Sequence, residues 1–81
     1  MDYNQIINEV NQIFKNVLDE ENTQLQYSST ANDVEGWDSL THIQLVVAIE
    51  KYFKIRFTSL EIQGFKNVGE MCEGILKKIP Q

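Results

Sequence analysis

The sequence predicts an all-α fold, a four-helix bundle with a short third helix and a long loop between helices 1 and 2. Two observations support this fold class. Apolar residues recur at three- and four-residue steps in separate segments, which is the period of helices with a buried face. Helix-capping residues precede these segments, and no segment is a convincing strand. The chain has 81 residues, so residues 1–81 are expected to form a single domain.

The first helix is expected at about 3–18 and is followed by a long loop. Its buried stripe is Ile6, Val10, Ile13, Phe14, Val17 and Leu18. Asp2 can cap this helix, and Gln5 three residues later completes a capping box. Residues 19–38 have no sustained period and are rich in turn formers. A loop of this length in a small domain is often functional. Four apolar residues are expected to pin it to the body: Leu25, Tyr27, Val34 and Trp37.

The second helix, at about 39–53, has the strongest apolar pattern. One stripe is Leu40, Ile43, Val46 and Val47, and another is Leu45, Ala48, Ile49, Tyr52 and Phe53. One stripe is expected to fill the core, while the other is either buried as well or exposed for a partner.

Two shorter helices are expected after an extended link. Thr58 and Glu61 form a capping box that opens the third helix, which ends near Gly64. Asn67 can cap a fourth helix at about 68–79, which Pro80 would stop. The inner stripe of this helix is Val68, Cys72, Ile75 and Ile79, with Met71 and Leu76 beside it.

Charge and composition exclude several classes of function. The net charge is −5; residues 1–50 hold nine acids and one base, and residues 51–81 hold three acids and six bases. An acidic front argues against binding nucleic acid and favours partners with basic surfaces. No apolar run is long enough for a membrane span, and no secretory signal precedes the first helix. The single thiol, Cys72, cannot form an internal disulfide, which indicates a reducing, cytoplasmic setting.

The most informative residue is Ser39, in the run Gly36-Trp37-Asp38-Ser39-Leu40 at the start of the second helix. With Asp38 as N-cap, Ser39 becomes the first helical residue and its hydroxyl points outward. Free backbone amides and the helix dipole at this end favour an attached phosphate. A serine in this place is suited to carry a group, although the Asp-Ser pair alone is better explained as a plain helix start.

This run and the helix layout resemble the acyl carrier protein family, the phosphopantetheine-bearing carriers of fatty acid, polyketide and nonribosomal peptide synthesis. The Asp38-Ser39-Leu40 motif is intact, and the resemblance covers nearly the whole chain. It implies that a phosphopantetheinyl transferase attaches 4′-phosphopantetheine from coenzyme A to Ser39. The thiol of the arm would then hold an acyl or aminoacyl group as a thioester between a loading enzyme and downstream transferases or synthases. The chain would be a monomeric carrier and not an enzyme.

The resemblance also implies the partner surfaces. Asp38 and Leu40 would help the transferase to recognise the site, and the second helix would be the main docking surface. The residues expected to contact partners are Leu40, Ile43, Val47 and Glu50. Fatty-acid carriers have several acids on this helix, whereas the matching positions here are Thr41, His42, Gln44 and Lys51. This departure predicts a specialised pathway rather than housekeeping fatty-acid synthesis.

Other functions have weaker support in the sequence than the carrier, and the main rival is an adaptor. A non-modified helical adaptor would use the apolar second helix to bind a partner. A hydrolase built on Asp38, Ser39 and His42 would need an oxyanion hole and a pocket, and the sequence has no nucleophile elbow. A calcium loop starting at Asp33 fails because Gln44 stands where a bidentate glutamate is needed, so no metal is expected. His42 is expected to face solvent or a partner.

Two further residues are expected to have structural roles. Cys72 is expected to be a small buried apolar residue rather than a reactive thiol. Trp37 is expected to anchor the long loop on the body, with contact to the arm or to partners as the alternative.

Overall fold

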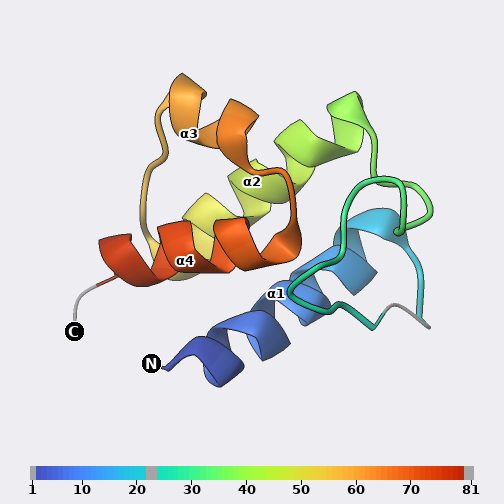
Figure 1. Ribbon diagram of the computed structural model, residues 1–81, viewed down its shortest axis with the longest axis horizontal. Coiled ribbons are helices and arrows are strands. Elements are labelled where there is room, and N and C mark those ends of the chain that lie inside the picture. Colours follow the sequence, from blue (N-terminus) through green and yellow to red (C-terminus); the bar gives the residue numbers. More distant parts are fainter. Residues whose placement is uncertain (1, 22–23, 80–81) are drawn as a thin grey trace.

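The computed structural model describes residues 2–21 and 24–79, and these form an all-helical fold (Figure 1). The helices are α1 (Tyr3–Leu18), α2 (Ser39–Phe53), α3 (Ser59–Gly64) and α4 (Val68–Lys78). Helix α1 packs against both α2 and α4, and α3 lies on the side of the molecule away from α1 (Figure 1). In the part of the chain that the structure describes, no helix is long and apolar enough to cross a bilayer.

The predicted helix ends are confirmed by the caps. Asp2 and Gln5 form a reciprocal capping box on α1, with both N–H···O distances at 2.9 Å. Thr58 and Glu61 do the same on α3, and the side chain of Asn67 caps α4. Helix α4 is one residue shorter than expected. The stop expected at Pro80 lies outside the described residues.

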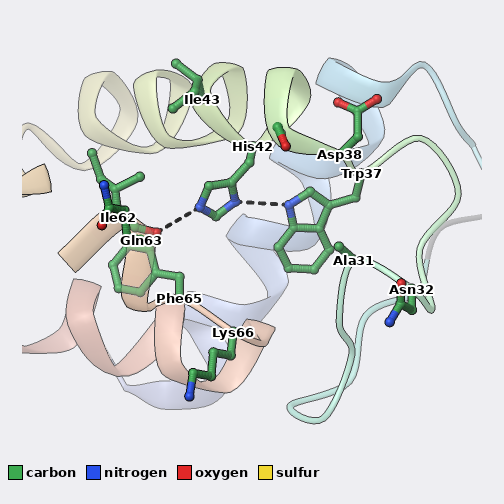
Figure 2. Close-up of a pocket in the computed structure, with 11 residues that line it drawn as sticks. Ala31, Asn32, Trp37, Asp38, His42, Ile43, Ile62, Gln63, Phe65 and Lys66 are labelled. Carbon is green, nitrogen blue, oxygen red and sulfur yellow. Dashed lines mark hydrogen bonds between the residues drawn. The ribbon is translucent and has the colours of Figure 1, made fainter. Parts of the chain in front are cut away.

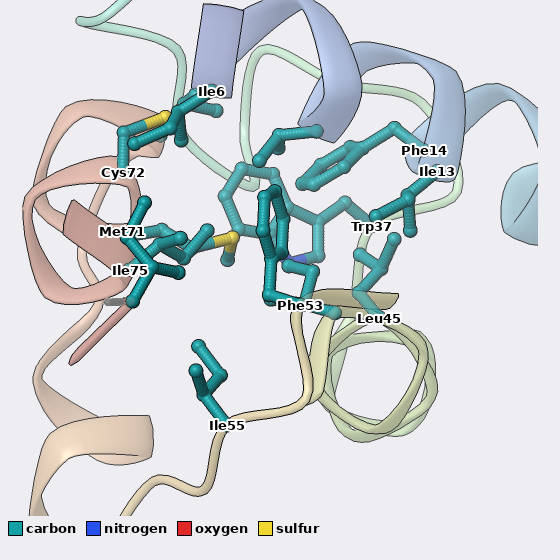
Figure 3. Close-up of a cluster of buried hydrophobic side chains, with 14 residues drawn as sticks. Ile6, Ile13, Phe14, Trp37, Leu45, Phe53, Ile55, Met71, Cys72 and Ile75 are labelled. Atoms are coloured by element: carbon teal, nitrogen blue, oxygen red, sulfur yellow. The ribbon is translucent and has the colours of Figure 1, made fainter. Parts of the chain in front are cut away.

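The core lies where α1, α2 and α4 meet (Figure 3). Helix α1 buries Ile6, Val10, Ile13 and Phe14, and α4 buries Val68, Gly69, Met71, Cys72 and Ile75. From α2 the buried residues are Leu45, Val46, Ile49 and Phe53. The buried and exposed residues of α2 therefore do not follow the two apolar stripes predicted from the sequence. Val46 joins the core, whereas Tyr52 is exposed and its hydroxyl donates a hydrogen bond to Glu9. Cys72 is buried, as expected.

The long loop is fixed to the first turn of α4 by backbone hydrogen bonds. The Val68 amide donates to the carbonyl of Ser29 at 2.9 Å, and the Gly69 amide donates to the carbonyl of Tyr27 at 2.8 Å. A Cβ on Gly69 would lie 2.9 Å from that Tyr27 oxygen, so only glycine permits the approach. Leu25 and Val34 pack against the core. The loop is therefore held in one position, and it leads directly to the start of α2.

Candidate functional site

Asp38 caps α2 and fixes the start of the helix beside Ser39. One carboxylate oxygen, Oδ1, accepts hydrogen bonds from the Leu40 amide at 3.0 Å and the Thr41 amide at 2.9 Å. The pKa of the Asp38 carboxyl is held below its usual value, mainly by hydrogen bonding from Thr41 and to a smaller extent by the bond from Leu40. The predicted cap is confirmed. The free amides expected at this helix end are found only in part, because Asp38 occupies two of them.

Thr41 connects the cap to the turn before it. Its Oγ1 accepts a hydrogen bond from the Asp38 amide at 2.7 Å and lies 2.6 Å from the carbonyl oxygen of Gly36, to which it donates. Gly36 has φ of +88°, a left-handed conformation that glycine adopts without strain. The turn, the cap and the first helical turn therefore form one rigid unit around Ser39.

Ser39 is the first residue of α2 and its side chain is exposed. Its hydroxyl forms no hydrogen bond with any residue in the described ranges. Ser59, the first residue of α3, is also exposed and is also followed by an exposed leucine, Leu60. Exposure at a helix start is therefore not unique to Ser39, and what distinguishes it is its surroundings.

The main difference is an open hollow of about 560 Å³ beside Ser39. It is lined by residues from the long loop, the start of α2 and the end of α3 (Figure 2). The lining residues include Asn32, Trp37, Ile43, Ile62, Phe65 and Lys66. Sequence reasoning did not find the contribution of the segment 62–66, because no local pattern indicates how α3 packs against α2.

Trp37 and His42 link the three elements around this hollow. Trp37 is 5% exposed, and its ring packs edge-on against Phe14 with 5.1 Å between ring centroids. Its predicted role as the anchor of the loop is confirmed. The Trp37 Nε1–H donates to His42 Nδ1 at 3.0 Å, and His42 Nε2 lies 3.0 Å from the Ile62 carbonyl oxygen (Figure 2).

The expectation that His42 faces solvent or a partner is wrong. The ring is half-buried between the long loop and α3, and both nitrogens are bonded inside the protein. His42 lies one turn after Ser39. The three-residue spacing between them does not indicate that His42 has hydrogen-bond partners on the long loop and on α3. The same geometry removes the hydrolase alternative, because neither His42 nitrogen remains to activate the Ser39 hydroxyl.

The outward face of α2 is apolar. Leu40, Ile43 and Val47 are 69%, 52% and 42% exposed, so the three apolar partner-contact candidates lie on the surface. Glu50 is placed differently. It is half-buried, and its Oε2 accepts a hydrogen bond from the Phe57 amide at 2.8 Å, which ties α2 to the link that leads into α3.

The acidic loop is built by local hydrogen bonds. Asp33 Oδ2 accepts from the amide and the hydroxyl of Thr30 at 3.0 and 3.1 Å. Over residues 2–21 and 24–79, no three histidine, cysteine, aspartate or glutamate side chains are grouped to hold a metal ion. Burial, followed by the charge of Glu73, raises the pKa of the Cys72 thiol to about 12, which is consistent with an unreactive core residue.

Comparison with known proteins places this geometry in a family. The family model described as "Phosphopantetheine attachment site" matches residues 8–75. An acyl carrier protein from Cyanidium caldarium is 40% identical over 52 residues, which span 64% of this chain and 59% of that protein.

Solved structures agree. The holo acyl carrier protein of Geobacter metallireducens superposes with a TM-score of 0.85 at 37% identity, covering 90% of this chain and 84% of that one. An acyl carrier protein from Thermotoga maritima has the same fold, with a TM-score of 0.85 at 23% identity over 96% of this chain and 91% of that one. The predicted resemblance and fold class are confirmed. The chain belongs to the phosphopantetheine attachment family, a family of carriers rather than catalysts in which 4′-phosphopantetheine is bound covalently.

Proposed function

We propose that residues 1–81 form one carrier domain that holds an acyl or aminoacyl group on 4′-phosphopantetheine attached to Ser39. The observation that carries this proposal is the exposed Ser39 hydroxyl next to an open hollow, without a hydrogen bond to any residue of 2–21 or 24–79. When bound, the arm supplies a thiol that holds a carboxylic acid in activated form as a thioester. The free thiol Cys72 suits a reducing compartment such as the cytoplasm.

The surroundings of Ser39 fit a covalently attached arm. The rigid cap fixes the backbone, so the hydroxyl is presented to a transferase in one position. In the transfer, Ser39 Oγ bonds to the phosphorus that bears pantetheine in coenzyme A, and the pyrophosphate bond breaks. Adenosine bisphosphate leaves, and the hydroxyl proton passes to the transferase or to solvent. The hollow beside Ser39 has room for a flexible chain with amide groups, lined by both apolar and polar side chains.

The partners that we propose are a phosphopantetheinyl transferase, a loading enzyme and downstream transferases or synthases. They would dock on the exposed apolar residues Leu40, Ile43 and Val47 of α2, with the carrier working as a monomer. A tether raises the effective concentration of the passenger at each partner's site, so brief and weak docking is sufficient.

The charge of this surface supports a dedicated pathway rather than housekeeping fatty-acid synthesis. Beyond Asp38, the only acid on α2 is Glu50, and one of its carboxylate oxygens is bonded to the Phe57 amide. A second hollow, at the end of α2 and separate from the one beside Ser39, is lined by Lys51, Lys54 and Arg56 together with Glu50. The docking helix therefore offers little free negative charge to a basic partner. Purified fatty-acid elongation enzymes are expected to extend the loaded carrier poorly, and efficient elongation would count against a dedicated role.

Incubation with coenzyme A and a broad-specificity phosphopantetheinyl transferase tests the attachment. Intact-protein mass spectrometry is expected to show the addition of one arm to the wild type and none to Ser39→Ala. The matched control is Ser59→Ala, because Ser59 is also exposed, first in its helix and followed by leucine; this variant is expected to be modified like the wild type.

Two outcomes would count against a carrier modified at Ser39. An unchanged wild-type mass with several such transferases would favour the non-modified adaptor that docks through the apolar face of α2. Modification that persists in Ser39→Ala would place the arm on another residue.

A further inference from the structure

We propose that His42 closes the space between α2 and α3, so that the passenger is a short acyl or aminoacyl group that stays in the open hollow. This arrangement disfavours a fatty acyl chain folded into the core, because such a chain would have to displace the His42 ring. The inference rests on the proposed attachment at Ser39, and it names the class of substrate that this attachment can carry.

His42 is held by two opposed hydrogen bonds. The Trp37 indole has only an N–H to offer, so His42 Nδ1 is the acceptor in the 3.0 Å contact between them. The proton of the neutral ring is then on Nε2, which donates to the Ile62 carbonyl oxygen at 3.0 Å. The two rings are also stacked, with 5.9 Å between centroids and 21° between planes. One side chain therefore joins the long loop, α2 and α3 (Figure 2).

This connection lies one helical turn from Ser39, at the wall of the hollow that Ser39 also lines. Ser39 and His42 are three residues apart and share one side of α2. A chain that leaves Ser39 and turns inward between α2 and α3 must displace the imidazole ring from Ile62. Displacement leaves the Trp37 N–H without its acceptor. Because Trp37 is only 5% exposed, water replaces this acceptor poorly. Further along α2, Leu45 and Ile49 are completely buried.

The hollow offers the passenger a different place. Its apolar surface comes from side chains such as Ile43 and Phe65, and its polar groups come from Asn32, Gln63 and Lys66. It is open to solvent, so a long alkyl chain placed there would remain largely hydrated and gain little from the apolar patches. A short acyl or aminoacyl group has little apolar surface to bury and can use the polar groups. The open hollow therefore favours short passengers, and the His42 connection independently disfavours the entry of long ones into the core.

Acyl-coenzyme A donors of increasing length test this inference. A promiscuous transferase would load acetyl, butanoyl and octanoyl arms, and mass spectrometry would verify the attachment at Ser39. Nuclear Overhauser contacts between the acyl chain and the side chains of Leu45 and Ile49 would then be measured, together with Tm. The wild type is expected to show no contact to these two residues with any donor and a Tm that does not change with chain length.

The variant His42→Ala is expected to differ from the wild type with the octanoyl arm only. Contacts from the octanoyl chain to Leu45 and Ile49 should appear, and Tm should rise relative to the acetyl form. The matched control is Gln44→Ala, since Gln44 is exposed on α2 and does not line the hollow; it should behave like the wild type.

Contacts between the octanoyl chain and the core in the wild type would overturn the inference, and this measurement decides it even if His42→Ala does not fold. A folded His42→Ala that still excludes the octanoyl chain would overturn the role of His42. Failure of the proposed function is distinct from both outcomes, since no arm would then be found on Ser39 at all.

Discussion

Replacing His42 with alanine is expected to lower the free energy of unfolding by about 2 kcal/mol. The substitution removes the acceptor of the Trp37 N–H and the donor to the Ile62 carbonyl. Trp37 is 5% exposed, so water replaces its lost acceptor poorly, and an orphaned buried donor costs about 1–3 kcal/mol. Ile62 is half-buried, and its carbonyl can be hydrated at smaller cost. The higher helix propensity of alanine returns about 0.5 kcal/mol.

A double-mutant cycle with Trp37→Phe isolates the hydrogen bond. Phenylalanine removes the N–H but keeps an aromatic ring facing Phe14. Urea unfolding of the wild type, both single variants and the double variant should give a coupling energy of about 1–2 kcal/mol. For a domain of this size, the loss in His42→Ala corresponds to a fall in Tm of roughly 8–16 °C. Additivity of the two substitutions within about 0.5 kcal/mol would refute the reasoning, because uncoupled residues behave in that way.

Three further predictions concern the cap, the core thiol and the turn. Because the folded pKa of Asp38 is lowered, the stabilisation by its carboxylate is complete above about pH 4 and is lost as the pH falls through the folded pKa. The free energy of unfolding in urea should therefore differ less between about pH 6 and about pH 3 in Asp38→Asn than in the wild type. Because burial raises the pKa of Cys72 to about 12, the free energy of unfolding should fall as the pH rises above about 8.5. The part of this fall that comes from Cys72, between about pH 8 and about pH 9.5, should be absent in Cys72→Ala. Gly36 has φ of +88°, so Gly36→Ala should lower the unfolding free energy by roughly 1–2 kcal/mol, measured by urea unfolding.

The helices could be predicted from the sequence because their signals are local. The apolar period and the capping boxes of Asp2 with Gln5 and Thr58 with Glu61 lie within a few residues of one another. The division of α2 into buried and exposed faces could not be predicted, since both stripes are apolar. Tertiary packing buries Val46 and leaves Tyr52 exposed.

The site was only partly visible in the sequence. Asp38 and Ser39 belong to one contiguous motif, and the structure places them as expected at the start of α2. The hydrogen bonds of His42 join residues 5 and 20 positions away, and the second partner is a backbone carbonyl that any residue type could provide. No residue pattern therefore indicates the contact with Ile62, and it appears only when α3 is packed against α2.

Peptide mass analysis of the protein purified from its native source is the most direct test of the central claim. A phosphopantetheine arm, free or acylated, is expected on the fragment that contains Ser39, and the fragment that contains Ser59 should be unmodified. A native protein with an unmodified Ser39 under all growth conditions, or with its arm on another residue, would contradict the account.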